Sequence, residues 1–230
     1  MHFQHSSEIW RDYPELVPGV LFAEGIHKDV SVGPRVAKFN RIGEERLATA
    51  SEAELPEIQA WRRAFSRMGL KPTQYRSASE SLLRRFKKEK SLPQIHPLID
   101  LCNSMSLAFA IPVAAFDTSR ITEGIEVRYG SGSEEYLAFS GEIENPNAGE
   151  VIFADEAGQA HARRWTNRQS AHSAVRDTTT AVLIVAEAMH DSASEDIERL
   201  IAALDDELNA IWSITPKTAM LSQSSLRFDS

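Results

Sequence analysis

The stretch TTTAVLIVAEAM at positions 178–189 contains an unbroken apolar run, AVLIVA, in its middle. A short continuous apolar run predicts a strand that is buried on both faces and is therefore central in its sheet. Glu187 comes directly after this run. A carboxylate at the end of a buried strand indicates a candidate site there, and an ion-paired or exposed strand end is the alternative interpretation.

Further strands and helices surround this segment along the chain. Apolar or alternating segments bounded by turn residues predict strands at 16–26, 125–130, 136–141, 151–155 and 161–165. Apolar residues at helical spacing predict helices at 55–68, 77–90, 98–109 and 192–212. Ser77 with Glu80, and Ser192 with Glu195, have the spacing of capping boxes. The order of these elements predicts one α+β domain.

Composition limits the class of protein. The chain has 230 residues and is 42% hydrophobic, so it can build a core without disulfides. The one cysteine, Cys102, has apolar neighbours, which favours a small core residue over a nucleophile. No apolar run approaches the ~20 residues of a membrane span, and the first residues lack the layout of a signal peptide. We therefore expect a cytoplasmic protein with no membrane partner.

Charge is distributed unevenly. The formal net charge of −8 argues against extended nucleic-acid coating, and we expect no DNA partner. However, residues 62–90 carry ten Lys or Arg against two Glu. The helix at 77–90 has Leu83 on its apolar face and Arg84, Arg85 and Lys87 on the other. That basic face is either an ordinary solvated helix surface or a phosphate-contacting surface.

The helix at 98–109 is almost wholly apolar, which predicts that it is buried. Asp100 and Asn103 interrupt it and share a face because they are three residues apart. A buried Asp needs hydrogen-bond partners or a cavity. The pair is either a structural hydrogen-bonding centre or part of a site.

Motifs for several chemistries are missing from the sequence. There is no phosphate-binding P-loop, no nucleophile elbow and no histidine pair with metal-ligand spacing, so we expect no cofactor and no metal. The segment RRWTNRQS at 163–170 matches no such motif, but its polar composition suggests a binding chemistry. Within it, Arg164 and Arg168 could grip phosphate, Trp165 could stack on a base and Gln169 could read a base edge. A surface hairpin with a cation–π pair is the structural alternative.

Six blocks in order resemble the B3/B4 editing domain of the phenylalanyl-tRNA synthetase β subunit, in its stand-alone form. They are YRSASESLLRRF, LPQIHPLIDLCNSMSL, IPVAAFD, GEVIFADEAG, RRWTNRQS and VLIVAEAM, within residues 55–190. The resemblance implies a layered α+β domain with mixed sheets packed on helices around a central pocket. We expect this domain at 51–215, a strand-containing N-terminal extension of the same unit at 1–50, and a mobile tail at 216–230.

The resemblance also implies a reaction and a partner. It suggests a trans-acting editing hydrolase that cleaves the ester of a mischarged aminoacyl-tRNA, with a tyrosine-like or an arginine- or canavanine-like side chain. The alternatives are a module that binds tRNA or an amino acid without catalysis, and a small-molecule enzyme that uses the same pocket. The implied partner is aminoacylated tRNA.

Site residues are carried over position by position. Ala114 stands where the synthetase domain keeps an active-site histidine, so the catalytic residue is left unassigned. Asn103, Ser140 and Gly141 are pocket candidates, and the backbone of the last two could bind an oxyanion. Substrate-binding candidates are Asp100, Asn103, Ala114 and Glu187. Candidates for tRNA binding are Arg84, Arg85, Lys87, Arg164, Trp165, Arg168 and Gln169.

Overall fold

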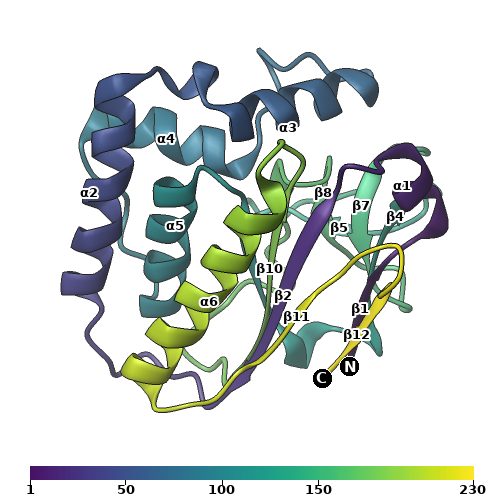
Figure 1. Cartoon of the computed structure of the whole chain (residues 1–230). Coiled ribbons are helices and arrows are strands. Elements are labelled where there is room, and N and C mark those ends of the chain that lie inside the picture. The colour runs from purple at the N-terminus through teal and green to yellow at the C-terminus, as the bar shows by residue number, and fades with distance from the viewer.

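The computed structural model describes all 230 residues and arranges them in three layers. Figure 1 shows helices on one face of a four-stranded sheet and a six-stranded sheet on its other face. The four-stranded sheet is antiparallel, with the order β11 (Lys217–Met220), β2 (Val17–Glu24), β10 (Ala181–Ala188) and β3 (Val113–Asp117). This is the α+β arrangement that the sequence predicted.

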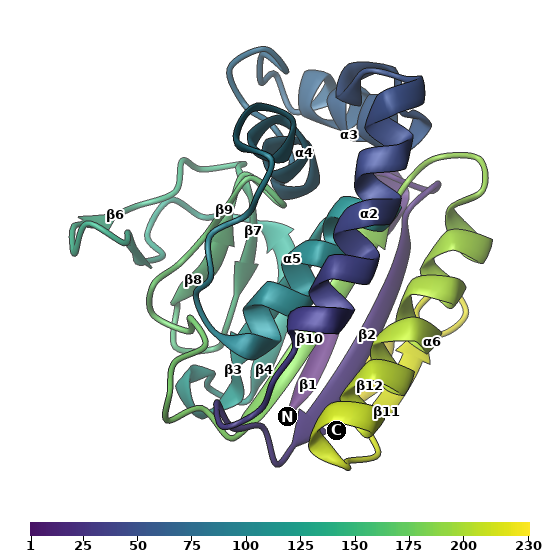
Figure 2. The same cartoon turned by 90° about the vertical axis from the view of Figure 1, so that its left-hand side faces the viewer.

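The six-stranded sheet is mixed. Its order is β12 (Arg227–Asp229), β1 (His2–His5), β4 (Gly124–Tyr129), β7 (Val151–Ala154), β8 (Ala160–Arg163) and β9 (Arg168–Gln169). Only β1 and β4 run parallel, and the other neighbours are antiparallel. A separate hairpin joins β5 (Tyr136–Leu137) to β6 (Ile143–Glu144), and Figure 2 shows it projecting away from the layers.

The helices lie on two sides of the sheets. Helices α5 (Pro97–Phe109) and α6 (Ala193–Trp212) pack on the four-stranded sheet, and α2 (Gly33–Thr49) packs on α5. Helices α3 (Pro56–Arg67) and α4 (Ala78–Glu89) lie across the top of the layers in Figure 1. The short elements are α1 (Ser7–Asp12) and the 3₁₀ turns η1 (Glu52–Glu54) and η2 (Thr118–Arg120). No helix combines the length and the apolar character that crossing a bilayer requires.

Strand β10 is central, as its apolar run predicted. It lies between β2 and β3 and is buried on both faces. Val182 and Ile184 pack with the helices, whereas Leu183 and Val185 join the core between the two sheets. Because side chains alternate along a strand, Glu187 points to the same side as Val185, towards the six-stranded sheet.

Six strands and two helices lie where the sequence predicted no element: β1, β3, β6, β9, β11, β12, α1 and α2. The expectation of a mobile tail at 216–230 is corrected. β11 pairs with β2, β12 pairs with β1, and Phe228 is buried. The cause is pairing with strands at the opposite end of the chain, which leaves no local signature in a polar segment.

Both predicted capping boxes form incompletely. The Ser77 hydroxyl accepts the N–H of Glu80, but the Glu80 carboxylate binds Arg62 instead of the cap backbone. The Ser192 hydroxyl donates to Asp196 and caps no backbone group. The helix starts were thus correct to one residue, while the reciprocal hydrogen bonds were not.

Candidate functional site

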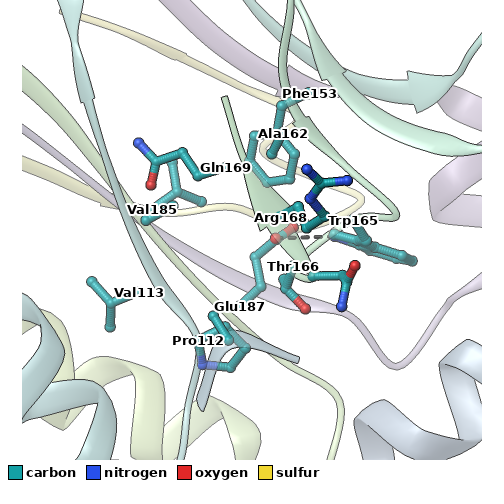
Figure 3. Close-up of a pocket in the computed structure, with 13 residues that line it drawn as sticks. Pro112, Val113, Phe153, Ala162, Trp165, Thr166, Arg168, Gln169, Val185 and Glu187 are labelled. Carbon is teal, nitrogen blue, oxygen red and sulfur yellow. Dashed lines mark hydrogen bonds between the residues drawn. The ribbon is translucent and has the colours of Figure 1, made fainter. Parts of the chain in front are cut away.

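A cavity opens between the two sheets at the C-terminal end of β10. Figure 3 shows the side chains that line it, which come from β3, β7, β8, β10, the start of α4 and the segment between β8 and β9. Its volume is about 60 Å³. A cavity of this volume holds a few water molecules, since one water molecule needs roughly 10–15 Å³ measured in the same way.

Small side chains create this space. Ala114 on β3 pairs with Val185 on β10, so both lie on the face that looks towards the six-stranded sheet. Ala162 on β8 lines the opposite wall, and Ala78 at the start of α4 closes one side. Position 114 therefore matters for the shape of the site, and it supplies no titratable group.

Glu187 lies in the cavity wall with both carboxylate oxygens engaged. Its Oε1 is 2.6 Å from Nε2 of His5, and its Oε2 accepts the indole N–H of Trp165 at 3.0 Å. The indole N–H of Trp61 donates to the Glu187 backbone carbonyl at 3.3 Å. The side chain of Glu187 is only 2% exposed and that of His5 is fully buried. The strand-end carboxylate is therefore part of a rigid buried network that still borders the cavity.

His5 is the residue that the sequence interpretation missed. It ends β1 in the six-stranded sheet, so its contact with Glu187 joins the two sheets across the core. The alternation of Phe3 and His5, both buried, is the only local signal of this placement. A four-residue strand with two histidines is too short for that signal to be read.

The segment RRWTNRQS forms the hairpin between β8 and β9, and its tight turn lies in the cavity wall. Arg164 and Trp165 both have positive φ, 47° and 57°. Non-glycine residues in this region cost about 1–2 kcal/mol each, so other contacts must hold the turn. Trp165 is fully buried and bonded to Glu187, while the Arg164 guanidinium lies 4.9 Å from the Tyr75 ring centroid. The predicted stacking residue Trp165 thus serves the core, and the cation–π pair is present.

The same turn is tied to the start of α4. The N–H of Ala78 donates to the Thr166 carbonyl, and the Asn167 amide donates to the Arg76 carbonyl. Further along, the Gln169 amide donates to the Ala115 carbonyl at 2.7 Å. Arg168 lines the cavity and reaches Glu144 on the projecting hairpin at 3.4 Å. The segment therefore links α4, β3 and the hairpin around one opening.

Asp100 and Asn103 do not line the cavity. Asp100, in the first turn of α5, accepts the N–H of Ile95 at 2.8 Å, whereas the N-cap of this helix is His96. The pairing of Asp100 with Glu187 around one ligand is therefore not what the fold produces. The hydrogen bond to Ile95 explains the carboxylate at position 100, because it fixes the turn that leads into the helix.

Ser140 and Gly141 also lie outside the cavity. They occupy the exposed turn of the β5–β6 hairpin, and the Gly141 N–H donates to the Ala138 carbonyl. Gly141 has a φ of +90°, which explains the glycine by turn geometry. The turn uses the Gly141 N–H itself and neither residue lines the cavity, so this geometry does not support the oxyanion role expected for the pair.

The basic face of α4 is largely ion-paired. Arg84 and Lys87 both contact Glu52, at 2.8 Å and 3.1 Å, and Arg85 contacts Glu89 at 2.8 Å. These three cations are about half exposed, so water screens the pairs and they can exchange partners. Among the cations predicted for tRNA contact, Arg164 makes no ion pair within 4.0 Å. The surface stays a candidate for phosphate contact, but its charge is partly neutralised.

Three other polar side chains form a cluster that does not line the cavity. Atoms of Glu57, His190 and Asp196 lie within 4.8 Å of one another, in a spacing that could hold a metal. Arg46 pairs with Glu57, and Arg199 pairs with Asp196, so both carboxylates are already neutralised. We assign no metal to them.

A Ser-His-Asp arrangement is buried in the six-stranded sheet. His161 Nδ1 is 2.8 Å from the Ser173 hydroxyl, and its Nε2 is 3.4 Å from Asp155. Burial raises the pKa of Asp155, but hydrogen bonds from His161 and from backbone N–H groups outweigh burial and hold it at about 2. His161 and Ser173 are fully buried and line no described cavity, so the group is structural.

Burial also raises the pKa of the Cys102 thiol to about 12, which keeps it protonated.

Comparisons with known proteins agree on one family. A model described as the B3/4 domain matches residues 60–206. The phenylalanine–tRNA ligase β subunit of Shewanella oneidensis is 31% identical over 98 residues, which are 42% of this chain and 12% of the relative. That of Coxiella burnetii is 42% identical over 48 residues, 21% of this chain and 6% of the relative. This chain therefore spans about a tenth or less of the length of these curated relatives.

Among solved structures, an N-terminal fragment of the phenylalanyl-tRNA synthetase β subunit from Pyrococcus horikoshii overlays with a TM-score of 0.49 and 9% identity. The overlay covers 96% of this chain and 54% of the fragment. The family match alone covers well over half of the chain. The chain belongs to the B3/4 domain family.

Proposed function

We propose that this chain is a trans-acting editing hydrolase, which removes a wrong amino acid from a mischarged tRNA. The observation that carries the proposal is the cavity between the sheets, with Glu187 fixed in its wall and Ala114 leaving it open. Its relatives are β subunits of phenylalanine–tRNA ligase, and every residue that lines the cavity lies within residues 60–206, which match the B3/4 domain.

In this proposal the cavity receives the amino-acid side chain. Each oxygen of Glu187 accepts one hydrogen bond within the protein, and a carboxylate oxygen can accept about two. Glu187 can therefore accept one more bond from a hydroxyl on the ligand. A cationic side chain is less favoured, because Asp100 does not join Glu187 and His5 already contacts it.

The reaction is hydrolysis of the ester between the amino acid and the terminal ribose. The oxygen of a water bonds to the ester carbonyl carbon, the bond to the ribose oxygen breaks, and that oxygen takes the proton. Because position 114 offers no base and Glu187 is engaged, the neighbouring ribose hydroxyl is the group that assists the water. Arg168 lines the cavity and Arg164 lies in the turn before it, and both are the proposed contacts of the tRNA end.

One observation favours a second function. The cavity has no histidine in its lining, which fits a module that binds an amino acid or a tRNA end without hydrolysing it. Release of radiolabelled amino acid from a panel of mischarged tRNAs separates the two. Turnover of at least one member that is slowed in Glu187→Gln, but unchanged in the exposed control Glu45→Gln, supports the hydrolase. Tight binding without turnover across the panel supports the module.

A further inference from the structure

Thr166 is the one polar side chain in the cavity lining whose hydrogen-bonding group has no partner. Its Oγ1 is buried and makes no hydrogen bond. The other polar groups of the lining are all engaged. Trp165 binds Glu187, Asn167 binds the Arg76 carbonyl, Gln169 binds the Ala115 carbonyl and Arg168 contacts Glu144.

A buried hydroxyl without a partner destabilises a folded protein, because it loses its bonds to water and gains none. Valine has nearly the shape of threonine and would remove this penalty. The hydroxyl at Thr166 therefore has no structural explanation in the fold, whereas the other polar groups of the lining have one. Unsatisfied groups of this kind are expected where a ligand completes the hydrogen bonding.

The position of Thr166 is held firmly. It follows Arg164 and Trp165, the two residues with positive φ, and its carbonyl accepts the N–H of Ala78 at the start of α4. Figure 3 shows it in the wall near Glu187 and Pro112. A donor that is fixed before the ligand arrives is what stabilisation of a developing charge requires.

We propose that Thr166 is a catalytic residue whose hydroxyl donates a hydrogen bond to the carbonyl oxygen of the bound ester. This rests on the proposed hydrolase function. As the water oxygen bonds to the carbonyl carbon, that oxygen gains negative charge, and the Thr166 hydroxyl stabilises it until the bond to the ribose oxygen breaks. Thr166 thereby takes the oxyanion role expected for Ser140 and Gly141, which do not line the cavity.

The test compares Thr166→Val with Thr166→Ser, which keeps the hydroxyl. Loss of one oxyanion donor lowers kcat by about 10²–10³-fold, so we expect that loss in the valine variant with KM nearly unchanged. The serine variant should stay within about tenfold of wild type, since it keeps the donor. The valine variant should also melt about 2–4 °C higher, because an unsatisfied buried hydroxyl is gone. A merely structural role for Thr166 predicts a lower melting temperature instead.

Equal kcat in the valine variant and wild type would overturn the proposal. If wild type hydrolyses no member of the tRNA panel, the hydrolase function itself fails, and a second measurement decides on Thr166. An aminoacyl-adenosine analogue with a tetrahedral phosphonate in place of the ester carries the charged oxygen that the hydroxyl would meet in the transition state. Binding of this analogue about tenfold weaker to the valine variant than to the serine variant supports the hydrogen bond. Equal binding, or no binding to either, overturns it.

Discussion

The cavity wall and the contact between η1 and the outer face of α4 each contain a buried carboxylate with two partners, yet these contacts have opposite consequences. Glu187 is 2% exposed and fixes His5 and Trp165, which are buried as well, in one geometry. Glu52 is also buried, but it meets Arg84 and Lys87, whose side chains are about half exposed and can move to another anion. Burial of the partners therefore decides whether a charged contact positions a site or remains available to another molecule.

The largest expected effect is at Glu187. Replacement by Leu leaves His5 and the Trp165 indole buried without their acceptor, and breaking such a network costs about 3–5 kcal/mol. Glu187→Gln keeps one acceptor oxygen and should cost less. The free energy of unfolding in urea measures both variants. Equal stability of wild type and the Leu variant would show that the network does not hold the sheets together.

Acid should remove a second buried contribution, at Glu134. Burial raises the pKa of this carboxyl, but N–H donors of Ser131 and Arg128 outweigh burial and hold it at about 2, below its ordinary value of 4.5. Because the pKa is lowered in the folded protein, the stabilisation is complete above pH 4.5 and is lost as the pH falls towards 2. The shift corresponds to about 3 kcal/mol. Urea unfolding at a series of pH values should show this loss in wild type and a smaller one in Glu134→Gln.

His5 should show an intermediate effect that depends on one hydrogen bond. His5→Phe leaves an oxygen of Glu187 without a donor, which costs about 1–3 kcal/mol. His5→Gln places an amide N–H near the position of Nε2 and should recover part of that loss. The indole N–H signal of Trp165 in an NMR spectrum reports the same change, since Trp165 binds the other oxygen. If Phe and Gln variants are equally stable and leave that signal unmoved, His5 does not position Glu187.

The smallest stability effect should be on the exposed face. Arg85→Ala removes an ion pair with Glu89 and should change stability by less than about 0.5 kcal/mol. Affinity for aminoacylated tRNA should nevertheless fall in Arg85→Ala, and the slope of its salt dependence should decrease. Arg41→Ala, an exposed ion-paired cation on α2, is the matched control. Equal affinity of wild type and both variants would remove α4 from the proposed interface.

Much of the fold could be predicted from local patterns in the sequence. The apolar run of β10 and the helical spacing of α3 to α6 are local patterns, and both predicted the right element. Strands β1 and β12 left no local pattern because they are stabilised by pairing with each other from opposite ends of the chain. The same dependence on contacts between distant parts of the chain limited the prediction of the cavity residues. Glu187 and Ala114 were found because they lie in recognisable blocks, whereas His5 is buried by a partner on β10 that only the fold brings near.

The misplaced candidates share one physical cause. Asp100, Ser140 and Gly141 are polar or small residues that local geometry uses, in the turn before a helix and in a hairpin turn. Such residues look the same in a sequence whether they serve a turn or a ligand. Thr166, in contrast, has no local feature that marks it within RRWTNRQS, and only the absence of a hydrogen-bond partner in the fold distinguishes it.

The most direct test of the central claim is the rate at which purified protein releases amino acid from mischarged tRNA. The assay should use saturating enzyme, wild type beside Glu187→Gln, and tRNAs charged with hydroxyl-bearing, cationic and apolar amino acids. We expect release from at least one hydroxyl-bearing substrate, and slower release in the variant. No release from any of these tRNAs by wild type would contradict it.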